Sequence, residues 1–412
     1  MNPLAVSHCS IVTALGDGQA ATVAALRESR TGLAPRGFET AALDTWLGVV
    51  EGLDGGDDGN AGARSHATGF KGPLAAFDCR NNRLAARALH SDGFADAVQQ
   101  AAQRVGPARV GVFLGTSTSG ILQTEIAYRH RDPATGALPP TLDYAGTHNT
   151  YSVARYVRAA LGLQGPAQVV STACSSGAKV FATAARMIAL GVVDAAVLGG
   201  VDSLCMTTLY GFKSLELLST DICRPWDADR NGLSIGEGAA FALLERQPPD
   251  PSAVCGWLLG AGESSDGHHM SSPHPEGAGA AAAMRGALAQ AGLQAADVDY
   301  LNLHGTGTPG NDAAEDLAVC AVFGTALPCS STKGHTGHTL GAAGAVEAVI
   351  SLLVLRHGVM PSGLSLQHPD PTLHAAVLQG SARVAERPLR VVASNAFGFG
   401  GSNACLLFGA DR

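Results

Sequence analysis

Short apolar segments of strand length alternate with longer segments of helical pattern along most of the chain. Strands that alternate with helical segments of about 10 to 15 residues are typical of βαβ units and a largely parallel sheet. The sequence therefore predicts an α/β fold. In the first part of the chain the strand candidates are 5–13, 109–115, 167–171, 195–199 and 239–245, and the helix candidates are 19–28, 93–105, 150–161 and 177–190.

A second set of candidates follows the proline-rich segment 247–251, which has the composition of a linker. We therefore expect two halves, 1–250 and 251–412, although a position-by-position comparison demonstrates no internal repeat. The strand and helix candidates of the second half are 256–264, 277–292, 300–303, 313–323, 341–357, 390–396 and 404–408.

The composition is that of a chain able to bury large cores, because 46% of the 412 residues are hydrophobic. The nine cysteines follow neither disulfide-framework nor Cys-x-x-Cys spacings, so we expect reduced thiols. The N-terminal segment lacks a basic stretch followed by an apolar one, and no uninterrupted apolar run reaches membrane-spanning length. We expect a cytoplasmic protein with no membrane span.

The net charge of −8 argues against nucleic-acid binding, which needs a clustered positive field to neutralise phosphates. Local exceptions are Arg80, Arg83 and Arg87 at helical spacing, and Arg129 and Arg131 in a loop-like stretch. These arginines either form solvated charged faces or bind an acidic partner.

Cys174 is the first candidate for chemistry. It lies where an apolar strand-like run, 169–171, breaks through small residues into the helical segment 178–190. The unpaired N–H groups and positive dipole end of a helix N-terminus favour thiolate over thiol. Small neighbours leave room for an acyl group on sulfur, so the segment predicts covalent acyl transfer. A buried structural cysteine is the alternative.

Two histidines lie in segments that support this chemistry. His304 ends an apolar strand and precedes a glycine turn, and His338 stands just ahead of a small-residue helix. A third segment, 395–403, reads Asn-Ala-Phe-Gly-Phe-Gly-Gly-Ser-Asn. With the Cys174 segment, these motifs in this order resemble the β-ketoacyl-acyl-carrier-protein synthases that elongate acyl chains. That branch carries Cys-His-His, whereas initiating synthases carry Cys-His-Asn and thiolases use a second cysteine near the end.

The resemblance covers nearly the whole chain and implies a thiolase-like five-layer α-β-α-β-α fold, built from two similar halves with the active site between them. By this resemblance, the first half would carry the nucleophile Cys174, whose backbone N–H would form the oxyanion hole with that of Phe399. The second half would carry His304 and His338, which as neutral imidazoles would hydrogen-bond the malonyl thioester and stabilise the enolate left when carbon dioxide departs. The expected product is a β-ketoacyl chain.

Further roles come from the same resemblance. Lys333, paired with Glu347, would keep the histidines neutral by charge repulsion. Phe399 would gate the pocket by swinging on Gly398 and Gly400. Thr118 would line the acyl pocket.

No cofactor and no metal are expected. The His335-x-x-His338 spacing suggests zinc but lacks companion ligands, and the glycine runs lack the strand–GxGxxG–helix arrangement of a dinucleotide site. The Gly-, Ala- and Asp-rich segment 38–72 is expected to be a surface loop, and its acidic run 54–60 does not follow the EF-hand pattern.

The resemblance also implies partners. The chain would form a homodimer, or a heterodimer with a homologous cysteine-less subunit, through the strand 195–200. It would bind acyl- and malonyl-loaded acyl carrier protein through basic residues, although Glu216 stands where elongating synthases place a basic residue. The candidate docking residues are Arg80, Arg83, Arg129 and Lys213.

Two alternatives come from other classes. A non-catalytic partner subunit of the chain-length-factor type shares this fold but lacks the cysteine nucleophile that Cys174 provides. A coenzyme A thiolase needs a late reactive cysteine, and Cys405 lies inside a strand candidate instead. Among synthases, the segments 207–227 and 268–275 are closer to aryl-polyene and type II polyketide pathways than to housekeeping fatty-acid synthesis.

Overall fold

A computed structural model describes residues 1–53 and 69–412 of the chain. The acidic run 54–60 lies outside the described residues. The rest of the expected surface loop 38–72 is not a loop throughout, because it contains strand β4 (Trp46–Gly48), in which Leu47 is buried. Strand β4 pairs with β3 (Leu33–Pro35) and β8 (Ile235–Gly236) in a small three-stranded sheet.

Five strands of the first half form one side of the large sheet. They are β1 (Leu4–Thr13), β5 (Val110–Gly115), β6 (Ala167–Val170), β7 (Ala195–Asp202) and β9 (Gly238–Glu245), in the order β6-β5-β7-β9-β1. β5 runs parallel to β6 and β7, whereas β9 runs antiparallel to both of its neighbours.

The second half repeats this topology. Its strands are β10 (Gly256–Ser265), β11 (Tyr300–Asn302), β12 (Cys329–Ser330), β15 (Val391–Gly398) and β16 (Ser402–Gly409), in the order β12-β11-β15-β16-β10. Counted along the chain, both sets have the spatial order third, second, fourth, fifth, first, with the same parallel and antiparallel pairs. The two halves, which show no repeat when their sequences are compared position by position, thus repeat the same strand order.

The two sets join along a short seam. β1 and β10 pair antiparallel from Leu4↔Leu258 to Val6↔Gly256, which makes one 11-stranded sheet that includes the short β2 (Gly16–Asp17).

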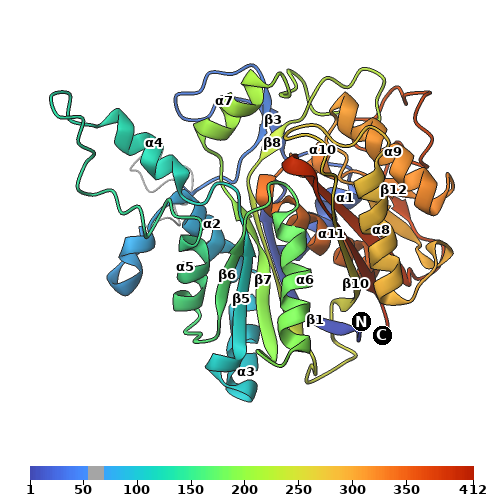
Figure 1. The fold of residues 1–412 in the computed structure, drawn as a ribbon, viewed down its shortest axis with the longest axis horizontal. Helices are drawn as coiled ribbons and strands as arrows, with labels where there is room; N and C mark the ends of the chain where they lie inside the picture. Colours follow the sequence, from blue (N-terminus) through green and yellow to red (C-terminus); the bar gives the residue numbers. More distant parts are fainter. Residues whose placement is uncertain (54–68) are drawn as a thin grey trace.

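Helices form three layers around the strands (Figure 1). α6 (Ser176–Ala189) and α11 (Ala343–His357) pack against each other and against both sets of strands. Outer helices cover the other faces, so the five-layer α-β-α-β-α fold is confirmed. The outer helices are α2 (Arg80–Leu89), α3 (Phe94–Val105) and α5 (Ser152–Ala160) on the first half, and α8 (Ala278–Ala291) and α9 (Pro309–Phe323) on the second.

The remaining helices and strands lie outside the layers described so far. Helices α4 and α7, which contact each other, fall where no helix was predicted, so Arg129 closes a helix and does not lie in a loop. These elements are α1 (Gly18–Arg27), α4 (Ile121–Arg129), α7 (Met206–Ser214), α10 (Lys333–Thr336), β13 (Val359–Met360) and β14 (Arg383–Val384).

The stretch Leu340–His357 is the one helical stretch among the described residues that is long and apolar enough to cross a membrane by length and composition. It contains α11, and 89% of it is buried inside the protein. Its place between the two sets of strands explains its apolar character, because every face of this helix meets other protein.

Two predictions about surfaces are wrong. Strand β7, expected at a dimer interface, is an interior strand between β5 and β9, and all of its residues are already buried. Arg80, expected to dock a carrier protein, is 3% exposed and forms a buried ion pair with Glu237, with Nε 2.9 Å from Oε2. Arg80 therefore belongs to the interior between α2 and β9.

The crossing of α6 and α11 depends on two glycines. A Cβ atom at Gly177 would lie 2.7 Å from the backbone nitrogen of Ala345, and one at Gly344 would lie 2.6 Å from that of Ala178. Backbone atoms cannot yield as a flexible side chain can, so each site requires glycine. This close approach sets the position of one central helix relative to the other.

We predict that Gly344→Ala lowers the stability by about 1–3 kcal/mol, because the added methyl group overpacks the helix crossing. Gly286→Ala is the matched control: this exposed glycine of α8 has its nearest atom at 3.5 Å, and alanine there should stabilise the helix by about 0.5–1 kcal/mol. Urea unfolding followed by circular dichroism measures both changes. Equal stability of Gly344→Ala and the parent would contradict the account of the crossing.

Candidate active site

Cys174 lies in the turn between β6 and α6. Ala173, just before it, has φ +52°, a left-handed conformation uncommon for a residue with a side chain. The Ser176 hydroxyl ties the turn by accepting the Thr172 N–H at 2.8 Å. This turn holds the Cys174 thiol, 7% exposed, at the N-terminal end of α6.

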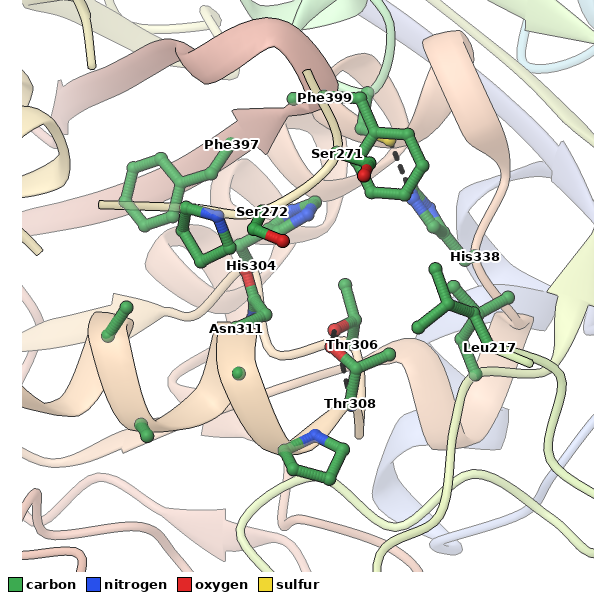
Figure 2. A pocket seen from close by; sticks show the side chains of 18 of the residues that line it. Leu217, Ser271, Ser272, His304, Thr306, Thr308, Asn311, His338, Phe397 and Phe399 are labelled. Atoms are coloured by element: carbon green, nitrogen blue, oxygen red, sulfur yellow. Dashed lines mark hydrogen bonds between the residues drawn. The ribbon is translucent and has the colours of Figure 1, made fainter. Parts of the chain in front are cut away.

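The structure brings both predicted histidines to this thiol, although they come from the other half of the chain. His304 follows β11, and His338 follows the short α10. His338 Nε2 lies 3.0 Å from Cys174 Sγ. The two imidazole rings meet edge to face, with centroids 5.4 Å apart and an interplanar angle of 84°. Both rings border the same cavity in Figure 2.

Lys333 is fully buried beneath the histidines and contacts three acceptors. Its Nζ donates to the backbone carbonyl of His304 and to Glu347 Oε1, and lies 3.3 Å from His304 Nδ1. A lysine amine in this position can only donate, so His304 Nδ1 accepts and the ring proton resides on Nε2. The structure therefore pairs Lys333 with Glu347, as predicted. The separate contact of Lys333 with His304 Nδ1 selects the tautomer of His304.

Glu315 fixes the backbone at His304 from the other side. Its two carboxylate oxygens accept the N–H groups of His304 and Gly305, both at 2.8 Å, and Asn395 donates to the same carboxylate at 3.1 Å. Burial raises the pKa of Glu315 to about 7. Glu315 lies in the helix candidate 313–323, and no role for it was predicted. The available signal was an acidic residue on a helix that directly follows a histidine-glycine turn.

Burial and charge decide the protonation states. Burial, together with the positive charge of Lys333, lowers the pKa values of His304 and His338 well below the ordinary value, so both are neutral near pH 7. Burial raises the pKa of Cys174 to about 11, against the opposing effects of Lys333 and of the backbone N–H groups of Phe399 and Cys174. The resting nucleophile is therefore a thiol, not the thiolate that the helix N-terminus alone suggested.

The cavity beside the thiol has a volume of about 450 Å³. Phe399 borders it, with its ring 5.7 Å from that of Phe212 on α7. Gly398 is needed for close approach, because a Cβ there would lie 2.7 Å from the Thr172 carbonyl oxygen, and Gly400 has φ +79°. Phe399 thus sits between two glycines at the cavity wall.

Thr118 does not line this cavity. Its hydroxyl donates to the buried carboxylate of Asp202 at 2.8 Å. Asp202 also accepts the N–H groups of Ser117 and Thr118 after β5, and that of Ala342 before α11. Asp202 therefore joins the loop after β5 to the central helix α11, a role that no sequence motif indicated.

The remaining docking candidates differ in exposure. Lys213 is exposed on α7, close to Phe212 of the cavity wall. Arg129 pairs with Glu39, and Arg83 forms two hydrogen bonds to Asp78 at 2.7 Å. Of the four candidates, Lys213 is best placed for a partner at the cavity mouth.

The ligand atoms of Cys174, His304 and His338 lie within 4.8 Å of one another, a separation that a metal ion could bridge. The Lys333 amine beneath His304 opposes a further cation there. His335, the other residue of the zinc-like spacing, directs its Nδ1 to the Arg30 carbonyl at 3.0 Å and serves packing.

This site, a cysteine at a helix N-terminus facing two neutral histidines in a five-layer α/β fold, defines a condensing acyltransferase of the thiolase-like class. Profiles of the beta-ketoacyl synthase N-terminal and C-terminal domains match residues 2–249 and 255–367. The chain therefore belongs to the β-ketoacyl synthase family.

Individual relatives agree. The mitochondrial 3-oxoacyl-[acyl-carrier-protein] synthase of Arabidopsis thaliana is 42% identical over 264 residues, which span 60% of this chain and 57% of that protein. The 3-oxoacyl-[acyl-carrier-protein] synthase 2 of Vibrio cholerae is 32% identical over 83% of this chain and 88% of that protein. The ketosynthase ApeO of Xenorhabdus doucetiae, solved in complex with its chain length factor ApeC, superposes with a TM-score of 0.84 at 36% identity, over 99% of this chain and 98% of that one.

We predict that alkylation of Cys174 by iodoacetamide accelerates with pH beyond pH 9, because its thiol titrates near pH 11. Lys333→Met should slow alkylation at pH 8 by about three- to tenfold, since it removes the charge that lowers the pKa of Cys174. Lys213→Met, which removes an exposed lysine, should leave the rate unchanged. Peptide mass spectrometry gives the rate at Cys174, and a plateau below pH 8 would show a thiolate at rest.

Proposed function

We propose that this chain catalyses the decarboxylative Claisen condensation of malonyl-carrier-protein with an acyl chain held on Cys174, as a 3-oxoacyl-[acyl-carrier-protein] synthase of fatty-acid or polyketide biosynthesis. The single observation that carries the proposal is the convergence of Cys174, His338 and His304, with the tautomer of His304 selected by Lys333. We take 1–250 and 251–412 as the two halves, supported by their repeated strand order.

The first half-reaction is acyl transfer. The Cys174 thiol gives its proton to His338 Nε2, 3.0 Å away, as sulfur attacks the thioester carbonyl carbon of the acyl carrier. The N–H groups of Cys174 and Phe399, which already face the sulfur, hold the oxyanion. His338 then returns the proton to the departing pantetheine sulfur, and acyl-Cys174 remains.

The second half-reaction needs hydrogen-bond donors. His304 presents Nε2–H because Nδ1 faces Lys333. His338 Nδ1 has no hydrogen-bond partner among the described residues, so no protein group fixes its tautomer and Nε2 can donate in this step. Together they bind the malonyl thioester oxygen while carbon dioxide leaves. The enolate carbon attacks the carbonyl carbon of acyl-Cys174, the acyl–sulfur bond breaks, and the β-ketoacyl chain stays on the carrier while the released Cys174 thiolate takes a proton from solvent.

The cavity suits a pantetheine arm. Its wall carries the hydroxyls of Thr306 and Thr308, 2.8 Å apart, on the turn that follows His304 (Figure 2). These hydroxyls can hydrogen-bond amide groups of the arm, while Leu217 and Phe212 supply apolar contact. We propose acyl- and malonyl-loaded acyl carrier protein as the partner, with Lys213 in the docking surface.

We also propose a cytoplasmic dimer, either of two copies or with a homologous cysteine-less subunit. The ApeO–ApeC complex supports the second form, because a 36% identical ketosynthase pairs there with a chain length factor. We place the enzyme in a polyketide or aryl-polyene pathway on the basis of the segments 207–227 and 268–275.

The two alternative functions fit the site less well. A chain-length factor would lack the nucleophile that Cys174 supplies beside His338. Cys405, which a thiolase would need as its second cysteine, is fully buried in β16 and is not among the cavity-lining residues. Burial raises the pKa of Cys405 to about 12.

Substitution of each histidine should affect the two half-reactions differently. His304→Ala should still form acyl-enzyme yet lose malonyl decarboxylation by on the order of 100- to 1,000-fold, because only a donor of the second step is removed. His338→Ala should slow both steps, since it also accepts the thiol proton. Intact-protein mass spectrometry and carbon dioxide release measure the two steps.

Cys174→Gln is the matched control, since it removes the nucleophile and keeps both histidines. It should end condensation but retain decarboxylation. Unimpaired carbon dioxide release in His304→Ala would contradict the proposed function.

Lys213→Glu should reduce turnover of carrier-bound substrates severalfold, and more at low salt, because the reversed charge repels an acidic carrier within a Debye length of about 10 Å. Turnover of a small acyl-pantetheine thioester should be unchanged. Arg285→Glu on the outer helix α8 serves as the control. An equal loss of turnover with both substrates would show that Lys213 supports the fold and does not bind the carrier protein.

A further inference from the structure

A pair of cysteines lies away from the active site. Cys9 Sγ is 3.5 Å from Cys255 Sγ, a contact between residues 246 positions apart. Cys9 is in the middle of β1, and Cys255 directly precedes β10. Neither residue lines the cavity beside Cys174, so the proposed condensation has no use for them.

The backbone holds the two thiols together. The Cys255 N–H donates to the Val6 carbonyl at 2.8 Å, immediately beside the Val6↔Gly256 pair that ends the seam between β1 and β10. The pair therefore sits where the two halves of the molecule join. Its Sγ atoms need to move about 1.5 Å closer to reach the S–S bond length of about 2.05 Å, a shift within reach of side-chain rotation.

The pair is buried but lies close to the surface. Cys9 is 1% exposed and Cys255 is 9% exposed, and the preceding residues 249–253 are exposed. Cys255 is thus the more exposed of the two thiols and the one nearer to this exposed linker.

The surroundings favour ionisation of Cys255 over Cys9. The hydrogen bond from Cys9 and the positive charge of Arg356 on α11 lower the pKa of Cys255, against the effect of its burial. The same contact, together with burial, raises the pKa of Cys9. Thiolate character marks the sulfur that reacts with peroxides, and its neighbour then acts as the resolving thiol.

We propose that Cys9 and Cys255 form a reversible disulfide that joins the two halves of the chain under peroxide. The Cys255 thiolate attacks one peroxide oxygen, which breaks the O–O bond, releases water after protonation and leaves a sulfenic acid. The Cys9 sulfur then attacks the Cys255 sulfur, the S–O bond breaks, and the Cys9 proton leaves with the hydroxyl group as water. In sum, two thiols are oxidised by two electrons, and one hydrogen peroxide is reduced to two waters. A dithiol reductant reverses the reaction.

The consequence is a change in stability. A cross-link between residues 246 positions apart removes much of the freedom of the unfolded chain. The melting temperature should rise by about 5 °C on formation of the disulfide. This shift combines the large loss of unfolded-chain entropy expected for so long a closed loop with the small shift per unit of stability, about 1 °C for each kcal/mol, expected for a protein of this length.

The test uses the full chain treated with stoichiometric hydrogen peroxide, then blocked with iodoacetamide and digested without reduction. Cys174→Ala is examined in parallel, so that oxidation of the nucleophile does not obscure the result. We expect a cross-linked peptide containing Cys9 and Cys255, lighter by two hydrogens than the sum of the two peptides, which dithiothreitol abolishes. The melting temperature should rise with the cross-link and return on reduction.

Cys320→Ser is the matched control, because Cys320 is partly exposed and its sulfur contacts Asp316 instead of a second thiol. This variant should retain the cross-link and the shift, whereas Cys255→Ser should lose both. The wild-type peptide analysis does not depend on any variant folding. A Cys255 sulfinic acid with Cys9 still reduced, or both residues alkylated after peroxide, would overturn the proposal.

Discussion

The chemistry of this protein depends on one buried amine. Lys333 contacts the carbonyl and Nδ1 of His304 and the carboxylate of Glu347, so it ties the end of β11 to α10 and α11. Each contact has a separate effect: the ion pair with Glu347 compensates the buried charge, and the two contacts to His304 fix the backbone and the tautomer. Without a donor at Nδ1, nothing would direct the His304 ring proton toward the substrate.

The fold serves to bring this arrangement to a thiol from the other half of the chain. Cys174 stands at the N-terminal end of α6, and Glu347 lies on α11, the second central helix. Because glycines at the crossing of these helices allow backbone contact, the nucleophile and the histidines meet closely enough for a 3.0 Å contact between sulfur and nitrogen. Repetition of one strand order in both halves provides two equivalent sets of strands that enclose the helix pair.

Local signals predicted much of this site from the sequence. Cys174 and His304 each stand where an apolar run ends in a glycine- or small-residue turn, and His338 stands just ahead of a small-residue helix; such junctions place side chains at strand or helix ends. Features that depend on distant partners could not be read in the same way. Arg80 has the helical spacing of a surface arginine, yet its partner Glu237 is 157 residues away and buries it. The interior position of β7 likewise follows from strand order, which no local pattern specifies.

Protonation was the other point at which local reasoning failed. A helix N-terminus favours a thiolate, but full burial of Cys174 has the larger, opposite effect on its pKa. Burial also favours the neutral form of the two histidines, by lowering their pKa values, and hydrogen-bond donation requires that form.

The state of His304 tests the central claim most directly. Nitrogen-15 NMR of histidine-labelled protein, assigned through His304→Gln, distinguishes the two neutral tautomers from the imidazolium. The account predicts a neutral ring at pH 6, protonated on Nε2 and unprotonated on Nδ1, and a loss of this preference in Lys333→Met. An imidazolium at pH 6, or a proton on Nδ1 in the parent protein, would contradict it.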